Sequence, residues 1–254
     1  MKKRKAGIVI FVIVLIITAV RIKSMDSHRI SGRILAENIA GPGMMRLVEQ
    51  SMQAQAQKTS VTEIAVKEWK HPQAALTFDD GPDIRYTPLL LDGLKDRNVR
   101  ASFFLLGEKV EQYPELVERM QKEGHLVGNH TYHHVQLNKL NETKAREEIL
   151  KTNNLIYETT GVYPLYLRPP FGAWKKNLEL CVEMLPVFWT IDTLDWKVQN
   201  TEKIVRTVQE QIEDGAIILM HDEYDTSVEA ALQVVDELKN QGYELVTVDQ
   251  LILP

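Results

Sequence analysis

The chain has 254 residues and a formal net charge of −5, and its one cysteine is Cys181. This length allows one domain with a substantial core plus an appendage, and the acidic balance gives no support for binding to nucleic acid or to anionic substrates. A single cysteine excludes an intrachain disulfide, and Cys181 is expected to be a small buried hydrophobic residue and not a nucleophile.

The first 23 residues differ in composition from the rest of the chain. Four basic residues at 2–5 precede the apolar run 6–20, and Arg21 and Lys23 follow it. This order is typical of a signal peptide or a signal anchor. The run would span roughly 22 Å as a helix, which is short for a hydrocarbon core of about 30 Å and favours a signal peptide. The absence of an Ala-x-Ala-like site after it and the dense basic flank favour an uncleaved anchor.

Residues 24–73 contain a glutamine-rich stretch at 50–57 and a Gly-Pro-Gly break at 41–43, without a clear core pattern. We interpret them as a stalk or linker that is helical in part around 44–58. A flexible chain of this length spans roughly 40 Å root-mean-square. That reach is enough to lift a domain from a membrane towards a cell wall.

From residue 74 onward, apolar runs alternate with amphipathic segments. The predicted strands lie at 74–78, 99–105, 125–128, 165–167, 187–191, 216–220 and 244–248. Thr87 is expected to cap a helix that begins at Pro88, and Gly124 and Gly242 stand where C-terminal helix caps belong. This repeated β/α pattern predicts parallel strands whose C-terminal ends share one face. Periodicity alone does not separate a closed barrel from an open sheet.

Two adjacent carboxylates, Asp79 and Asp80, stand where the first predicted strand meets the Gly81-Pro82 turn. Burying unpaired carboxylates in a core is costly, whereas a strand end directs them into a cleft. There, one carboxylate can hold a metal while the other handles a proton. The alternative interpretation is a turn with two solvated acids.

His130 and His134 are four residues apart, so on a helical turn they would share a face and bind one ion. Two imidazoles and one carboxylate oxygen are a familiar ligand set for catalytic zinc, with one position left open for water. A histidine pair alone is weak evidence, because histidines also cluster by chance and cap helices. His133 is expected to point away from the ion.

Three further polar motifs lie at predicted strand ends or in rigid loops: RPPFG at 168–172, DTLDW at 192–196 and ILMHD at 218–222. Each motif alone is compatible with a surface turn or a capped strand. Their occurrence in separate β/α units predicts one shared site on the face where the strands end.

The ordered set TFDDGP, HTYHH, RPPFG, DTLDW and ILMHD resembles the polysaccharide deacetylases of the NodB-homology type, carbohydrate esterase family 4. The resemblance covers residues 74–254 and implies an α/β fold, a distorted (β/α) barrel with about seven parallel strands. It implies metal-dependent removal of N-acetyl groups from an N-acetylhexosamine glycan, with peptidoglycan favoured by the stalk and tether. The alternatives are a chitin-oligosaccharide deacetylase, an O-acetyl esterase on xylan-like polysaccharide and, least favoured, a glycan-binding module without turnover.

The resemblance also implies a metal site made of Asp80, His130 and His134. The expected cofactor is one divalent ion, with zinc preferred, although this ligand set also accepts cobalt, manganese, nickel or iron. The expected location is extracytoplasmic, either membrane-anchored or secreted. The expected partners are a cell-wall glycan and, through the N-terminal segment, a membrane.

Catalytic roles follow from the same resemblance. Asp79 is implied to be the general base and Arg168 its partner, which keeps the carboxylate ionised. His221 is implied to be the general acid, with its pKa raised by Asp195. The residues implied to line the substrate pocket are Phe171, Trp196 and Leu219.

Overall fold

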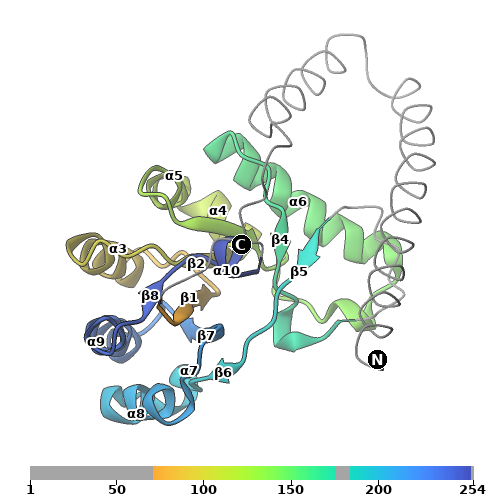
Figure 1. Cartoon of the computed structure of the whole chain (residues 1–254). Coiled ribbons are helices and arrows are strands. Elements are labelled where there is room, and N and C mark those ends of the chain that lie inside the picture. Colours follow the sequence, from red (N-terminus) through yellow and green to blue (C-terminus); the bar gives the residue numbers. More distant parts are fainter. Residues whose placement is uncertain (1–70, 175–183, 253–254) are drawn as a thin grey trace, which may run out of the picture. The chain divides into compact units, whose positions relative to one another are not determined.

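The computed structural model describes residues 71–174 and 184–252 (Figure 1). The predicted signal segment at 1–23, most of the predicted linker at 24–73, and Cys181 lie outside the described residues. A compact unit spans Val66–Pro254. Within the described residues, no helix combines the length and the apolar character needed to cross a membrane.

One 8-stranded parallel sheet forms the centre of this unit. Its order is β5-β4-β3-β2-β1-β7-β6, and β8 pairs with β1 outside this path. The strands are β1 (Gln73–Asp79), β2 (Ser102–Leu105), β3 (Leu126–Asn129), β4 (Tyr166–Leu167), β5 (Leu185–Pro186), β6 (Ile191–Asp192), β7 (Ala216–His221) and β8 (Glu244–Leu245). The parallel sheet and its path of seven strands confirm the predicted fold class.

Helices cover the outside of the curved sheet (Figure 1). They are α3 (Tyr86–Asp96), α4 (Gly107–Gln112), α5 (Pro114–Lys122), α6 (Glu142–Thr160), α7 (Asp195–Val198), α8 (Thr201–Gln211), α9 (Asp225–Asn240) and α10 (Val248–Ile252). Neighbouring helices pack in the order α8, α9, α3, α5, α6. Every residue of β1 is buried, as expected for a central strand covered on both faces.

Two local predictions are wrong. The predicted strand 187–191 is not one strand, because β5 ends at Pro186 and β6 begins at Ile191 on the other end of the sheet path. The apolar run therefore connects β5 at one end of the sheet path to β6 at the other end. The periodicity of the sequence does not reveal such a connection. Thr87 is not the cap of α3 either. Asp83 Oδ1 accepts hydrogen bonds from the backbone N–H groups of Arg85 and Tyr86, at 2.8 and 2.9 Å.

The predicted C-terminal caps are confirmed. Gly124 and Gly242 follow α5 and α9 with φ angles of 84° and 85°, in the left-handed region that glycine adopts without a Cβ clash.

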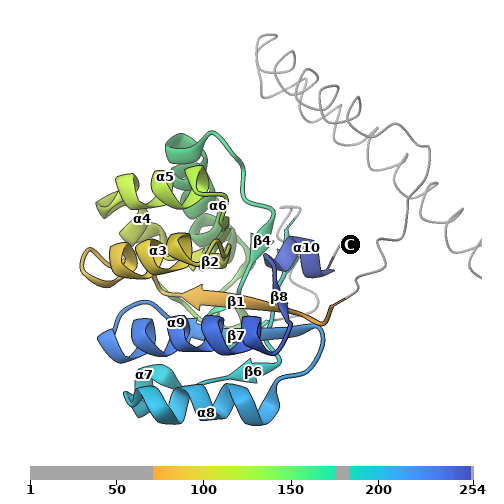
Figure 2. The ribbon, with the colours of Figure 1, turned by 60° about the vertical axis from the view of Figure 1, so that its left-hand side comes forward.

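The sheet brings the polar strand ends to one face. β1 and β7 are paired along their length (Figure 2). Asp79 is opposite His221 at the last position of this pairing. The same face receives the ends of β3 at Asn129, of β4 at Leu167 and of β6 at Asp192. The motifs that follow these strands are therefore close together in space although they are far apart in the chain.

Candidate active site

A pocket of about 410 Å³ lies at the C-terminal ends of the strands. All of the predicted site residues except Arg168 and Asp195 line it. Those two residues stand directly behind the lining, because Arg168 contacts Asp79 and Asp195 contacts His221. The structure therefore brings the whole predicted set together.

Asp80, His130 and His134 offer three donor atoms that lie within 4.8 Å of one another. Asp80 Oδ1 is 3.4 Å from His130 Nε2 and 3.5 Å from His134 Nε2. Tetrahedral zinc bonds of 2.0–2.2 Å place neighbouring ligand atoms about 3.4 Å apart. Asp80 Oδ1 is buried and has no hydrogen-bond partner in the described part of the chain. The donor set thus fits a divalent ion.

The His130 ring is oriented by a backbone carbonyl. Its Nδ1 lies 2.6 Å from the carbonyl oxygen of Arg168. Because a carbonyl only accepts, Nδ1 carries the proton and Nε2 presents its lone pair towards Asp80. Burial is the main cause that lowers the pKa of His130, to about 3, so the imidazole is neutral. Neutral imidazole is the form that binds a metal.

The two histidines do not share a helical turn, so this part of the prediction is wrong. Residues 130–134 form an irregular loop after β3. In this loop Thr131 and His134 have φ angles of 67° and 54°. These left-handed conformations turn the chain so that both rings meet Asp80, whose own φ is 69°.

Asp79 is held by a fully buried arginine. Arg168 Nη1 donates to Asp79 Oδ1 at 2.8 Å and to Thr77 Oγ1 at 2.7 Å. The guanidinium carbon also lies 4.3 Å from the centre of the Phe104 ring. Burial raises the pKa of Asp79 above its ordinary value, and the charge and hydrogen bond of Arg168 oppose this shift. Asp79 Oδ2 faces the pocket, 3.7 Å from His130 Nε2.

His221 forms a two-point contact with Asp195. Its backbone N–H donates to Asp195 Oδ2 at 2.8 Å, and its Nδ1 is 2.7 Å from Asp195 Oδ1. Burial alone would lower the pKa of His221, but the hydrogen bond and charge of Asp195, with Asp79 and Asp80, raise it to about 9. The ring is therefore protonated at neutral pH. Its Nε2 lies 3.8 Å from Asp80 Oδ2.

Comparison with known proteins identifies the family. Residues 67–188 match the polysaccharide deacetylase family. A peptidoglycan-N-acetylglucosamine deacetylase of Bacillus cereus is 40% identical over 186 residues, which cover 70% of this chain and 68% of that protein. The chain belongs to the polysaccharide deacetylase family.

Two further comparisons relate the polysaccharide deacetylase domain to characterised proteins. The peptidoglycan-N-acetylglucosamine deacetylase PgdA of Listeria monocytogenes is 44% identical over 177 residues, or 70% of this chain. The match spans only 38% of the length of that relative. The solved structure of the peptidoglycan deacetylase PdaC from Bacillus subtilis superposes with a TM-score of 0.70 at 42% identity, over 72% of this chain and 91% of that chain. This structural likeness supports the predicted fold of this chain, a distorted barrel.

The remaining lining of the 410 Å³ pocket is partly apolar. Among the lining residues, Leu219 is buried, whereas Phe171 and Trp196 are 62% and 49% exposed. No individual role was predicted for the other lining residues, although two of them belong to the DTLDW motif; they are Trp189, Asp192, Leu194, Glu223 and Tyr224. Asp192 ends β6, so the strand-end argument applied to the other acids was sufficient to find it. The others carry no spacing signal.

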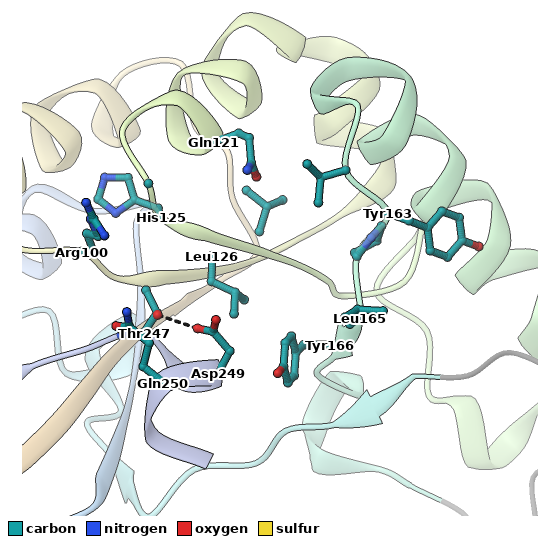
Figure 3. Close-up of a pocket in the computed structure, with 14 residues that line it drawn as sticks. Arg100, Gln121, His125, Leu126, Tyr163, Leu165, Tyr166, Thr247, Asp249 and Gln250 are labelled. Atoms are coloured by element: carbon teal, nitrogen blue, oxygen red, sulfur yellow. Dashed lines mark hydrogen bonds between the residues drawn. The ribbon is translucent and has the colours of Figure 1, made fainter. Parts of the chain in front are cut away.

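A second hollow, of about 330 Å³, lies at the N-terminal ends of β2, β3 and β4 (Figure 3). It contains none of the residues predicted for the deacetylase site. His125 lines it, and its Nδ1 accepts a hydrogen bond from the backbone N–H of Ala101 at 3.0 Å. This bond accounts for the histidine as a structural residue.

His125 links the stability of this deacetylase domain to pH. Burial lowers its pKa from 6.5 to about 4. Between these values the unfolded chain binds a proton that the folded chain does not, so the free energy of unfolding falls as pH falls. One such proton contributes at most about 1.4 kcal/mol per pH unit. His125→Asn keeps an acceptor for Ala101 and removes the titrating group.

Between pH 6.5 and pH 4, the free energy of unfolding of the wild type depends on pH. We expect His125→Asn to reduce this dependence by up to about 1.4 kcal/mol per pH unit. Urea unfolding at pH 7 and pH 5 measures the slope for the variant and the wild type. The variant loses packing against Phe103, whose ring is 5.3 Å from the imidazole, so its stability is lower at both pH values. An unchanged difference between the two pH values would contradict the prediction.

Proposed function

We propose that this chain is a metal-dependent hydrolase that removes N-acetyl groups from the N-acetylhexosamine residues of peptidoglycan. The products are acetate and a free amine. The observation that carries the proposal is the position of Asp79, which has the metal donors on one side and Arg168 on the other. His221 stands opposite on the paired strand. The names of the relatives above support the choice of an amide-linked cell-wall glycan.

The proposed metal ligands are Asp80, His130 and His134. When bound there, a divalent ion supplies Lewis-acid chemistry, because it polarises a carbonyl oxygen and lowers the pKa of water. We propose zinc, which suits two imidazoles and one carboxylate, although cobalt, manganese, nickel and iron are also compatible with these donors.

Asp79 is the proposed general base. Its Oδ1 is occupied by Arg168, so the proton from the attacking water goes to Oδ2, which faces the pocket. The guanidinium holds the carboxylate in one orientation and stabilises its charge before the transfer. The backbone N–H of Phe171 is proposed to donate to the oxyanion that develops on the amide carbonyl.

His221 is the proposed general acid. Asp195 binds Nδ1, so the proton on Nε2 is the one delivered to the departing amine. The raised pKa keeps that proton available at neutral pH. Leu219 and Trp196 are proposed to receive the acetyl methyl group, because they form the apolar part of the lining beside His221.

We further propose that residues 74–254 form the catalytic domain and that it acts outside the cytoplasm. Residues 1–23 would serve as an anchor or a signal peptide, and residues 24–73 as the linker to the cell wall. The basic cluster before the apolar run supports this assignment.

Acetate release tests the proposal. The purified chain is stripped of metal, reconstituted with zinc and offered peptidoglycan, N-acetylglucosamine oligomers and acetylated xylan in parallel. We expect zinc-dependent acetate from peptidoglycan and none from the matched Asp79→Asn protein. Acetate from xylan alone would replace the proposal with an ester hydrolase. Zinc bound at one equivalent without acetate from any substrate would favour a glycan-binding protein.

A further inference from the structure

The loop between the two proposed histidine ligands is held from outside. Thr131 and His134 have left-handed backbone conformations, each of which costs roughly 1–2 kcal/mol for a residue with a Cβ. Such conformations persist where surrounding contacts determine them. On one side, the start of α4 supplies two of these contacts. The N–H of Gly107 donates to the Thr131 carbonyl at 2.9 Å, and that of Glu108 to the Tyr132 carbonyl at 3.3 Å.

On the other side, Glu148 of α6 binds the N–H groups of the loop. Its Oε2 accepts hydrogen bonds from the backbone of Tyr132 at 3.1 Å and of His133 at 2.9 Å. Its Oε1 is 2.8 Å from His133 Nδ1. Three contacts on one carboxylate make Glu148 the main side-chain acceptor for the middle of the loop. They also account for His133, whose ring lies outside the pocket and contacts this acid.

A second contact ties the same loop to α6. Asn129 Oδ1 accepts from the N–H of Thr131 at 2.7 Å. Its Nδ2 donates to the carbonyl of Ile149 at 2.9 Å and to Asn153 Oδ1 at 2.6 Å. The start of the loop is thereby fixed in the core, whereas its middle depends on Glu148.

The two histidines differ in how their rings are held. His130 is buried and bonded to the carbonyl of Arg168. The side chain of His134 is 30% exposed, and in the described part of the chain its ring has no hydrogen-bond partner. Histidines that bind metals almost always use their second nitrogen in an outer hydrogen bond. The His134 ring lies 4.5 Å from the Phe171 ring, and the backbone beside it is held by the contacts of Tyr132 and His133 to Glu148.

We propose that Glu148 is a positioning residue for the metal site, which holds the backbone next to His134 so that Nε2 meets Asp80 Oδ1. Glu148 is not part of the pocket lining and does not touch the reacting atoms. The inference deepens the proposed function, because it rests on the metal site assigned there.

Zinc affinity of the metal-free protein tests this role. Competition with a chromogenic chelator gives the dissociation constant for the wild type, Glu148→Ala, Glu148→Gln and Glu147→Ala. Glu147 is the matched control, since it is exposed on the same helix and makes no side-chain hydrogen bond or salt bridge within the described residues. We expect Glu148→Ala to weaken zinc binding about ten- to a hundredfold, as for other outer contacts of metal ligands. Glu147→Ala should leave zinc affinity unchanged.

Glu148→Gln guards against a folding defect in the alanine variant. Its amide oxygen still accepts from the two backbone N–H groups but lacks the carboxylate charge, so zinc binding should weaken roughly threefold. Acetate release by Glu148→Ala should recover at saturating zinc, with an unchanged KM for the glycan.

The outcomes separate the inference from the function it rests on. If both Glu148 variants bind zinc as tightly as the wild type but melt at a lower temperature, Glu148 has only a structural role. That result would overturn the inference about Glu148 and leave the proposed metal site standing. A wild-type protein that binds no zinc, or an Asp80→Ala variant that binds it as well as wild type, would overturn the proposed metal site itself.

Discussion

Asp79→Asn is expected to abolish acetate release while zinc remains bound, and Asp80→Ala to lose zinc and activity together. Asparagine at position 79 cannot take a proton, and general-base catalysis typically contributes 10²- to 10⁴-fold. Its amide oxygen still accepts from Arg168, so the geometry of the pocket is preserved. Alanine at position 80 removes one of three donors and the buried Oδ1 that has no other described partner.

Zinc content per chain and acetate release, measured on the same samples, check this pair. Asp79→Asn leaves the buried Arg168 without its counter-charge, and breaking a buried pair costs about 3–5 kcal/mol. Melting temperature must therefore show that the variant is folded. Loss of zinc in the folded Asp79→Asn protein would show that Asp79 is a metal ligand and not a base. This outcome must be tested because Asp79 Oδ2 lies only 3.7 Å from His130 Nε2.

Asp195→Asn should move the basic limb of the pH–rate profile to lower pH. In the wild type, the hydrogen bond and charge of Asp195, together with the charges of Asp79 and Asp80, outweigh the effect of burial and raise the pKa of His221 to about 9. Without the charge of Asp195, a smaller contribution opposes burial and the pKa of His221 falls, so His221 loses its proton at a lower pH. We expect a shift of more than about one pH unit and a reduction of kcat by roughly a hundredfold or more.

The stability of the metal-free protein gives a second measurement of the same contact. A histidine whose folded pKa exceeds its unfolded value stabilises the fold fully below pH 6.5, and this contribution is lost as pH rises to about 9. It amounts to about 3 kcal/mol at most. Urea unfolding of wild type and Asp195→Asn at pH 6 and pH 9 measures it. Identical pH–rate and pH–stability profiles in the two proteins would refute the assigned role of Asp195.

Local sequence patterns predicted the sheet and the site to different extents. Strand ends were predictable because apolar runs stop abruptly on polar residues, as at Asp79 and His221, and parallel strands bring such ends to one face. The structure of segment 187–191 was not predictable, because an apolar run carries no information about the edge of the sheet that it joins. The loop from His130 to His134 was mistaken for a helical turn, because the spacing of the two rings is the same in both.

The support around the site was the least predictable part. Glu148 lies on a different element from the histidines and has no spacing that marks it out. Its role depends on hydrogen bonds to backbone N–H groups, which are the same for every residue type other than proline. Arg168 was found only through its motif, and its contact with Thr77 joins the segment after β4 to β1, which is not a neighbour of β4 in the sheet.

The pairing of Asp79 with His221 across β1 and β7 has a consequence for how such a protein diversifies. Neighbouring strands lie about 4.8 Å apart, and no loop adjusts that spacing. The two proposed proton-transfer groups therefore belong to paired strands, whereas Trp196 and Tyr224 lie in the segments that follow β6 and β7. We expect single substitutions of Trp196 or Tyr224 to change which sugar is accepted while Asp79 and His221 stay in place. The spacing of these two groups is thus fixed by strand pairing, and evolution or protein engineering can vary the neighbouring side chains without altering it.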